Sequence, residues 1–447
     1  MPTFIESFLA KGAAAAIKKA QPTIIGITGS VGKTTTRQMV AAALWDRESG
    51  VRVIVSQKNF NNELGLPLTV FGESDYPGKN LFAWIRVLSK ALFAQLGFWK
   101  LNADILVLEM GADKPGDLAH LTKIAPPDIS IVTGVSPVDG SLAPVHVQYY
   151  ASADEVAVEK STLVKALTPG GIAILNADDN RVYAMRHLTA VHKLGYGEND
   201  GSDIRLVSNK IITRQTPHGL EPYGIAVVIE CYQKPFHLVF EGVFGTSMAY
   251  AACAAAAVVV ALDLPEERLL NIAKCFTAMP GRARILPGVK SVTLFDDTYN
   301  AAPSSTISAI RDLASVTLAP HQRKIACLGE NRELGAKAEE MHYRIGQEAA
   351  RANVDVLVVC GIFAHAMKDG ALAAGLPADR VHVIEDTPQA GLFIQDIIKP
   401  GDIVLAKASQ GTLETKGVRM ERVIKELMAE PLRAKELLVR QEGKWVQ

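Results

Sequence analysis

The 447-residue sequence has few cysteines and no excess of either charge. Its five cysteines are odd in number, widely spaced and mostly set in apolar runs, which favours reduced, buried thiols and a cytoplasmic protein over a disulfide framework or a zinc site. Lysine plus arginine equals aspartate plus glutamate, at 47 each, so no overall field draws the chain to nucleic acid or to an anionic membrane. Any polyanion must therefore be held by a local cluster of cations.

The sequence also lacks a run of about 18 apolar residues, which a membrane-spanning helix requires, and the basic-then-apolar order of a signal peptide. The nearest candidate covers residues 80–101, where Arg86, Ser89, Lys90 and Gln95 interrupt the apolar positions. Its spacing predicts an amphipathic helix, and we expect this helix to pack against the core or a domain surface rather than to contact a membrane. We expect a short helix within residues 1–22.

Short β-branched runs alternate with alanine-rich helical stretches, which is typical of an α/β fold with a mostly parallel sheet covered by helices. Residues 203–245 alternate instead like antiparallel hairpins. A second αβ series begins after the break at Pro280-Gly281 and predicts a C-terminal Rossmann-like α/β domain. The expected organisation is an N-terminal helix at 1–22, a central domain at 23–282 and a C-terminal domain at 283–447.

A phosphate-binding loop is predicted where the first strand meets a helix, in the stretch PTIIGITGSVGKTTTRQMV at residues 22–40. A helix N-terminus offers unpaired N–H groups to phosphates, Lys33 adds a positive charge, and Thr34 adds a hydroxyl for magnesium. A plain glycine turn would need neither the lysine nor the hydroxyl residues after it, so we predict ATP binding by the central domain. The predicted nucleotide-binding residues are Gly29, Ser30, Val31, Gly32, Lys33, Thr34 and Thr35.

The glycine spacing of this loop, G-x-T-G-x-x-G-K-T, resembles that of the Mur ligase superfamily, whose members use ATP to join amino acids or peptides to a carboxylate. The resemblance extends over nearly the whole chain from about residue 22. The segment NNELGLPLT at residues 61–69 is most similar to the branch that adds D-alanyl-D-alanine. LEMGADKPGDLAHL and VHVQYYASADEVAVEKSTLV resemble two further family segments, and His146 and Lys160 stand 14 residues apart in the second.

The resemblance implies a site with two magnesium ions, because the attacking carboxylate and the phosphates of ATP are both anionic. Thr34 and Glu109 are expected to hold the first ion and His146 the second. Lys160 is implied to be carbamylated by carbon dioxide, which would let it help to bind the second ion and would require an amine of lowered pKa. Taken alone, Lys160 is also compatible with a solvated helix residue.

Asn59 and Asn62 are expected to line the muramyl or phosphate side of the cleft, although asparagines in this position also form turns. In the second domain, TLFDDTYNAAPSS resembles the segment that opens the family's ligase domain. It implies that Asp297 binds the ribose of ATP and that Tyr299 and Asn300 lie beside the nucleotide, although such residues also form caps and turns. Arg282 resembles the arginine that reaches the phosphates when the domains close. Lys407 and Ser409 are expected to hold the carboxylate of the incoming dipeptide.

Two features depart from the family pattern. FGTSMAYAACAAA replaces a segment that carries a His-Asn pair, and only 22 residues precede Thr23, where relatives carry a domain that grips the uridine diphosphate. The expected function is addition of D-alanyl-D-alanine to a UDP-MurNAc-peptide through an acyl phosphate by a monomeric enzyme whose catalytic residues are Lys33, Lys160, His146 and Arg282. The alternatives are a folylpolyglutamate, cyanophycin or polyglutamate type of ligase, or a non-catalytic ATP-binding module.

Overall fold

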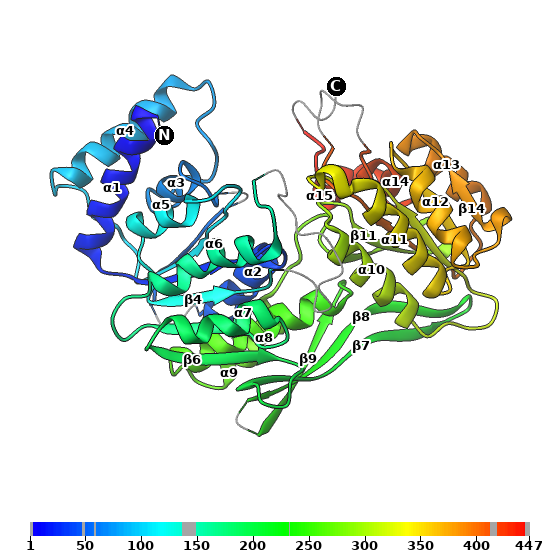
Figure 1. Cartoon of the computed structure of the whole chain (residues 1–447), viewed down its shortest axis with the longest axis horizontal. Coiled ribbons are helices and arrows are strands. Elements are labelled where there is room, and N and C mark those ends of the chain that lie inside the picture. Colours follow the sequence, from blue (N-terminus) through cyan, green and yellow to red (C-terminus); the bar gives the residue numbers. More distant parts are fainter. Residues whose placement is uncertain are drawn as a thin grey trace.

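The computed structural model describes residues 3–46, 50–57, 60–135, 149–231, 233–411 and 418–442. Two α/β units lie side by side, one built mainly from residues before 280 and one from the residues after it (Figure 1). The α/β prediction is confirmed, and so are the parallel strands and the hairpins. Among the described residues, no helix combines the length and apolar character needed to cross a bilayer.

The first unit is built on a nine-stranded sheet with the order β2-β3-β1-β4-β5-β6-β7-β8-β9. In this order, each strand from β2 through β1 to β7 pairs in parallel with its neighbours up to β7. Strands β7, β8 and β9 then form antiparallel hairpins. The strands are β1 (Thr23–Thr28), β2 (Val53–Val55), β3 (Ile105–Glu109), β4 (Ile129–Val132), β5 (Ile172–Asn176), β6 (His192–Gly197), β7 (Ile204–Thr216), β8 (Gly219–Cys231) and β9 (Lys234–Glu241).

Helices cover both faces of this sheet. They are α1 (Phe4–Ala20), α2 (Lys33–Leu44), α3 (Gly65–Val70), α4 (Leu81–Gln95), α5 (Asp117–Ile124), α6 (Ala153–Lys165), α7 (Asn180–Ala184), α8 (Thr246–Ala261) and α9 (Glu267–Cys275), with a 3₁₀ turn at Met185–Leu188. Helix α8 is almost entirely buried, because its alanines allow close approach from every side. The predicted N-terminal helix is α1, which begins with a capping box between Thr3 and Glu6.

The second unit has a six-stranded sheet in the order β10-β11-β15-β12-β13-β14, in which only the β10–β11 pair is antiparallel. Its strands are β10 (Arg284–Pro287), β11 (Thr293–Asp297), β12 (Lys324–Leu328), β13 (Val356–Val359), β14 (Val381–Val383) and β15 (Ile403–Lys407). Its helices are α10 (Pro303–Ser315), α11 (Ala338–Arg351), α12 (Ala364–Ala373), α13 (Thr387–Ile397), α14 (Glu421–Leu427) and α15 (Ala434–Leu437), with 3₁₀ turns at Val289–Ser291, Gly335–Lys337, Ala378–Arg380 and Pro431–Arg433.

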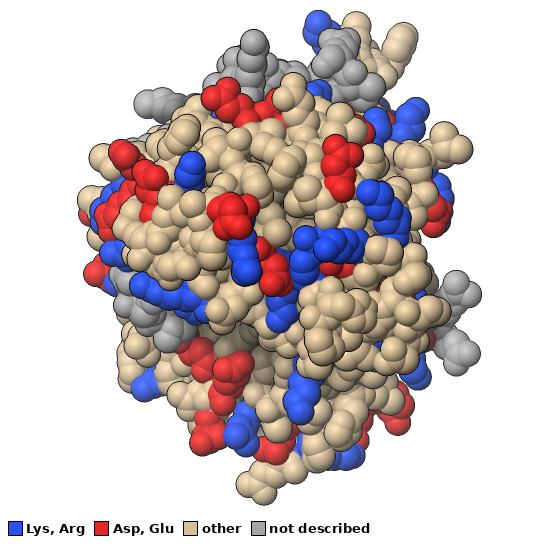
Figure 2. Space-filling model, turned by 90° about the vertical axis from the view of Figure 1, so that its right-hand side faces the viewer, with Lys and Arg blue, Asp and Glu red and all other residues tan. Residues whose placement is uncertain are grey.

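The hairpin of β7 and β8 reaches beneath the second unit (Figure 1). There the Gln322 side-chain amide accepts from the Leu220 N–H and donates to the carbonyls of Leu220 and Gly401. On the outer face of the second unit, acidic and basic side chains are interspersed (Figure 2). That mixture agrees with a chain of no net charge.

Strand order predicts where a ligand binds. In the first sheet the connections leave in opposite directions around β1, which lies between β3 and β4, whereas in the second sheet the last strand, β15, is inserted between β11 and β12. The carboxyl ends of parallel strands at such a switch point leave a crevice that accepts ligands. The predicted phosphate loop follows β1, and Glu109, Asp297 and Lys407 are the last residues of β3, β11 and β15.

The helix expected at residues 80–101 is α4, but most of its large apolar side chains do not face the core. Its buried residues are Val87, Ala91 and Ala94, which lie on the side that packs against α1. The helix packs against the first unit as expected, through these residues and through Trp84 and Leu88, which contact the core, while other large apolar residues face solvent. Phe82 and Ile85, for example, are 83% and 52% exposed.

Candidate active site

The loop between β1 and α2 has the geometry of an anion cradle. Gly29 and Gly32 have φ angles of 146° and 84°, and a Cβ atom at Gly29 would lie 2.1 Å from Thr133 Oγ1. Gly32 caps α2 without a side-chain hydrogen bond, which leaves the first N–H groups of the helix available. The Ser30 hydroxyl is buried and has no hydrogen-bond partner among the described residues. These features suit a bound phosphate.

Lys33 is the first residue of α2, and its side chain folds back over the loop. Its Nζ donates to the carbonyl oxygen of Gly29 at 2.7 Å. Burial lowers the pKa of Lys33, and the positive charge of Arg282 acts in the same direction. An anion placed in the loop would therefore favour the charged form of this lysine.

Glu109 is 3% exposed and lies beside the same helix. Its Oε1 is 3.3 Å from Thr34 Oγ1 and 3.3 Å from Asn61 Nδ2, and both of these groups donate to it. Its Oε2 lies 3.3 Å from Arg37 Nη1 but accepts no hydrogen bond of good geometry from any described residue. The structure thus brings the predicted metal ligands Thr34 and Glu109 together.

This pair suits magnesium, which binds one or two carboxylates and completes its shell with phosphate oxygens and water. No group of three or more histidine, cysteine, aspartate or glutamate side chains converges within the described ranges, so the phosphates would have to supply several ligands. His146, predicted for a second ion, and Asn59, predicted for the cleft, lie outside the described residues.

Lys160 lies on α6 and is 2% exposed. Its Nζ donates to the carbonyl oxygen of Ala112 at 3.3 Å. Burial and the nearby charge of Lys33 lower its pKa to about 7 from the usual 10.5. A large fraction of this amine is therefore neutral near pH 7, which is the state that reacts with carbon dioxide. The carbamate itself stays a prediction.

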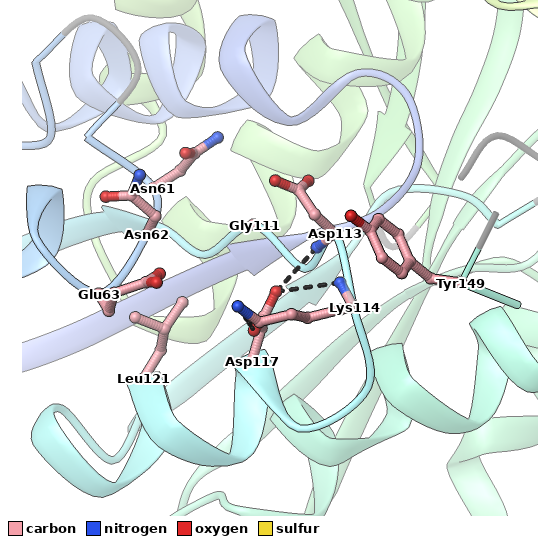
Figure 3. A pocket seen from close by; sticks show the side chains of 9 residues that line it. All are labelled: Asn61, Asn62, Glu63, Gly111, Asp113, Lys114, Asp117, Leu121 and Tyr149. Carbon is pink, nitrogen blue, oxygen red and sulfur yellow. Dashed lines mark hydrogen bonds and ion pairs between the residues drawn. The ribbon is translucent and has the colours of Figure 1, made fainter. Parts of the chain in front are cut away.

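A cavity of about 220 Å³ opens beside Glu109 (Figure 3). One side is formed by the segment before α3 and the other by the loop between β3 and α5. The lining residues are Asn61, Asn62, Glu63, Gly111, Asp113, Lys114, Asp117, Leu121 and Tyr149. Asn62 lies here as predicted, but its Oδ1 also accepts from the N–H groups of Leu64 and Gly65, so it shapes the turn as well.

In the second unit, the predicted nucleotide and dipeptide residues contact one another. Asp297 Oδ2 pairs with Lys407 Nζ, which also donates to the Asn300 carbonyl at 3.2 Å. Ser409 Oγ donates to the Ala301 carbonyl at 2.7 Å. The polar atoms of Lys407 and Ser409 are thus engaged within the unit, and their role in holding a dipeptide stays a prediction.

Arg282 joins the two units electrostatically. Its guanidinium lies 3.9 Å from the centre of the Tyr299 ring, and its charge is close enough to lower the pKa of Lys33. Nearby, Arg37 Nη2 lies 3.9 Å from Met279 Sδ, so the helix that follows the phosphate loop also contacts the linker between the units.

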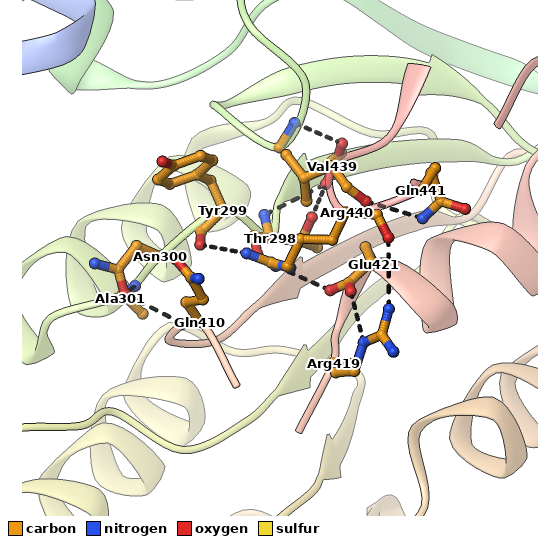
Figure 4. Close-up of polar contacts among 12 residues, drawn as sticks. Thr298, Tyr299, Asn300, Ala301, Gln410, Arg419, Glu421, Val439, Arg440 and Gln441 are labelled. Atoms are coloured by element: carbon orange, nitrogen blue, oxygen red, sulfur yellow. Dashed lines mark hydrogen bonds and ion pairs between the residues drawn. The ribbon is translucent and has the colours of Figure 1, made fainter. Parts of the chain in front are cut away.

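A buried polar cluster near the C-terminus supports the Tyr299 loop (Figure 4). Arg440 donates to the carbonyls of Thr298 and Tyr299 at 2.6 and 3.0 Å and to Glu421 Oε2 at 2.9 Å. Glu421 is fully buried and also pairs with Arg419. The last described segment of the chain therefore fixes the loop at Thr298 and Tyr299, which lies about 140 residues earlier in the sequence.

Sequence reasoning missed four residues of this region: Arg37, Asn61, Asp113 and Arg440. Asn61 stands within a segment that was singled out, and Arg37 follows the phosphate loop by one helical turn, so both carried a weak signal. Asp113 acts on both Lys33 and Lys160 through its charge. Arg440 stands in no motif, and nothing in the sequence links it to Tyr299.

Comparisons with known proteins agree with this geometry. Residues 27–80 and 90–259 match the Mur ligase middle domain, and residues 281–410 match the Mur ligase glutamate ligase domain. Over 426 residues the chain is 32% identical to the UDP-N-acetylmuramoyl-tripeptide--D-alanyl-D-alanine ligase of Mycobacterium leprae, covering 90% of this chain and 74% of the relative. The chain belongs to the Mur ligase family. This Mur ligase is also 26% identical to the Bacillus subtilis protein of the same name, covering 92% of the chain and 76% of that protein.

Solved structures show that the fold is that of Mur ligases. The MurF ligase of Thermotoga maritima, solved in complex with ADP, is 24% identical with a TM-score of 0.74 and covers 98% of this chain and 85% of its own. MurF of Acinetobacter baumannii is 22% identical with a TM-score of 0.70 and covers 90% of this chain and 77% of its own.

Replacing Lys160 with methionine is expected to change how stability depends on pH. Between a folded-state pKa of about 7 and the usual 10.5, the amine binds a proton only in the unfolded chain. The free energy of unfolding of the wild type therefore rises with pH across this window. The Lys160→Met variant should lose that rise, and its stability gain should be largest below pH 7, where the wild type buries a charged amine.

Urea unfolding in buffers free of carbon dioxide, at about pH 6 and about pH 9, measures this difference. Lys165→Met is the matched control, because Lys165 is exposed on the same helix. Equal pH dependence in wild type and Lys160→Met would contradict the lowered pKa.

Replacing Arg440 with methionine is expected to destabilise the second unit by about 3 kcal/mol, because a fully buried Glu421 loses one of its two cationic partners. Hydrogen exchange should also accelerate in residues 298–300, because the carbonyls of Thr298 and Tyr299 lose their donor. Arg433→Met is the control, since Arg433 forms only exposed ion pairs with Glu430 and Glu436 and should cost much less. Equal losses in the two variants would show that the cluster has no special role.

Proposed function

We propose that this Mur ligase joins D-alanyl-D-alanine to the carboxylate of a UDP-MurNAc-tripeptide and converts ATP to ADP and phosphate. The observation that carries the proposal is the convergence of Lys33, Thr34, Glu109 and Lys160 at the switch point of the first sheet in a chain 32% identical to a relative that bears this activity in its name. A module that only binds ATP has no need for a buried lysine of lowered pKa beside the phosphate loop.

The chemistry requires activation of a poor electrophile. The substrate carboxylate attacks the γ-phosphorus of ATP, the bond to the β-γ bridging oxygen breaks, and an acyl phosphate and ADP form. The dipeptide amine then attacks the acyl carbon, phosphate leaves with its electron pair, and the amine gives up a proton to yield the amide. The first attack brings an anionic carboxylate to the anionic phosphates, and the second develops negative charge on the acyl oxygen and the leaving phosphate, so positive charge around the phosphoryl group is the main requirement.

Several residues of this chain are placed to meet that requirement. The N–H groups at the start of α2 and the Lys33 ammonium would hold the phosphates, and Thr34 and Glu109 would hold a magnesium ion. Bound magnesium would neutralise phosphate charge during transfer. Carbamylated Lys160, together with His146, would serve a second ion.

The cavity beside Glu109 is the place we assign to the acceptor substrate. The cavity lies next to the proposed metal ligand Glu109, because Asn61 lines the cavity and its side chain donates to Glu109. In the second unit, Asp297, Tyr299 and Asn300 would contact the ribose and base, and Arg282 would reach the phosphates from the linker. Water would be excluded as the two units close, which protects the acyl phosphate.

The proposed reaction is tested by measuring ADP release with magnesium, ATP, UDP-MurNAc-tripeptide and D-alanyl-D-alanine, omitting each in turn. Turnover should require all four components, and Glu109→Gln should reduce kcat by at least about a hundredfold because charge stabilisation at the phosphoryl group is lost. Turnover only with a different carboxylate and amine, such as a folate and glutamate, would reject this substrate assignment. Nucleotide binding without turnover on any pair would reject catalysis.

The carbamate at Lys160 is tested with isotopically labelled bicarbonate and nuclear magnetic resonance. The wild type should show a carbamate carbon signal that is absent from Lys160→Ala and present in Lys165→Ala. Lys160→Ala should also lose ligation, and added bicarbonate should not restore it, because no amine remains to react. Full activity in Lys160→Ala would refute the role of the carbamate.

A further inference from the structure

Helix α4 presents its large apolar side chains to solvent. Leu81, Phe82, Ile85, Leu92, Phe93 and Leu96 form the outer face of α4, and each is between 46% and 83% exposed. These positions recur at helical spacing and share one side of the helix. Soluble monomers seldom expose so many large apolar side chains together, and such a face usually marks a binding surface.

The opposite side of α4 is fixed to the protein by small residues. A Cβ atom at Gly12 of α1 would lie 2.8 Å from Ala91, so the two helices approach at backbone distance. Lys19 Nζ donates to the Gly97 carbonyl, and Gln95 Nε2 donates to the Phe8 carbonyl. The outer face of α4 is therefore held in a defined orientation, and rotating it inward would break these contacts.

Basic residues are frequent in α1 and in the segment that contains α4. Lys79, Arg86, Lys90 and Lys100 lie within residues 76–100, a segment without a single acidic residue. Helix α1 adds Lys11, Lys18 and Lys19 against one acidic residue, Glu6. These two segments hold seven basic side chains and one acidic side chain, and with Glu73 and Asp75, which directly precede residue 76, the local excess is four positive charges in a chain whose total charge is zero.

Two of these basic residues are also anchored. Arg86 and Lys90 both pair with Glu73, which is 6% exposed, and the Lys90 Nζ to Glu73 Oε1 distance is 2.8 Å. These pairs hold the cationic flank of α4 beside its apolar face. Helices α1 and α4 lie at the outer edge of the first unit, on the side away from the second unit (Figure 1).

We propose that the outer face of α4, with the basic residues of α1 and α4 around it, docks onto the surface of an anionic lipid bilayer. Phenylalanine and leucine side chains on one face of a helix with lysine and arginine at its borders are the composition of helices that lie in the membrane interface. The apolar side chains would enter the boundary between headgroups and acyl chains, while the cations would contact anionic headgroups. A bilayer accounts for both the apolar face and the local excess of positive charge, whereas a second copy of this positively charged surface would be repelled.

The predicted attachment leaves the active site open. The phosphate loop lies at the carboxyl ends of the central strands, whereas α4 lies at the outer edge of the first unit (Figure 1). This inference goes beyond the proposed ligation and does not depend on it.

Sedimentation of the full chain with lipid vesicles tests the docking surface. The wild type should sediment with vesicles of equal parts phosphatidylcholine and phosphatidylglycerol, bind pure phosphatidylcholine more weakly, and be released as salt concentration rises. The double variant Phe82→Ser with Phe93→Ser should bind the mixed vesicles at least about tenfold more weakly, since each phenylalanine loses a buried apolar surface.

The matched control replaces two exposed apolar residues of the second unit, Ile362→Ser with Leu432→Ser, which are 79% and 99% exposed. This control should bind vesicles like the wild type, and circular dichroism should show all three proteins folded. Wild type that stays in the supernatant, or equal weakening in the two double variants, would overturn the proposal. So would a concentration-dependent dimer that the Phe82 and Phe93 changes disrupt, without vesicle binding, because the face would then serve a second copy.

Discussion

The buried carboxylate of Glu109 connects the segments that build the candidate active site. It ends β3, accepts from Thr34 of the phosphate-loop helix and from Asn61 of the cavity, and its backbone N–H donates to the Ser56 hydroxyl beyond β2. A buried charge is costly unless it is paired and hydrogen-bonded, so these segments are stable only in an arrangement that satisfies it. Arg37 supplies the compensating charge and reaches the linker at Met279, which extends the same network to the second unit.

The second unit has a similar buried ion pair at the carboxyl ends of its central strands. Asp297 and Lys407 end adjacent parallel strands, stand opposite each other in register, and form an ion pair in which the lysine is 2% exposed. The fully buried Glu421 and Arg440 hold the loop that follows β11. In both units a buried ion pair therefore lies at the carboxyl end of a strand, beside a loop that carries predicted site residues.

Most of the fold could be predicted from the sequence, because strand and helix periodicity are local signals. The phosphate loop and the Thr34–Glu109 pair were also predictable, since their motifs stand at strand ends that the parallel topology brings together. Arg440 was not predictable, because its partners at Thr298 and Tyr299 are distant in sequence and are backbone carbonyls that leave no sequence signal. For α4, periodicity predicted a two-sided helix but not which side is buried. The small residues determine which side is buried, because Gly12 and Ala91 let α1 and α4 approach more closely than a phenylalanine side chain would allow.

The cations around the phosphate loop would respond to the charge of a bound nucleotide. Lys33, Arg37, Lys160 and Arg282 gather around the phosphate loop of a chain with no net charge, so the local cluster of cations expected for a polyanion is present. In the absence of that polyanion, burial lowers the pKa of both Lys33 and Lys160, and a nearby positive charge acts in the same direction, from Arg282 on Lys33 and from Lys33 on Lys160. A bound triphosphate would raise both pKa values, because it adds negative charge nearby. The carbamate proposed for Lys160 would need its neutral amine, so that reaction would be favoured before the nucleotide binds, whereas bound phosphates would stabilise the charged form of Lys33.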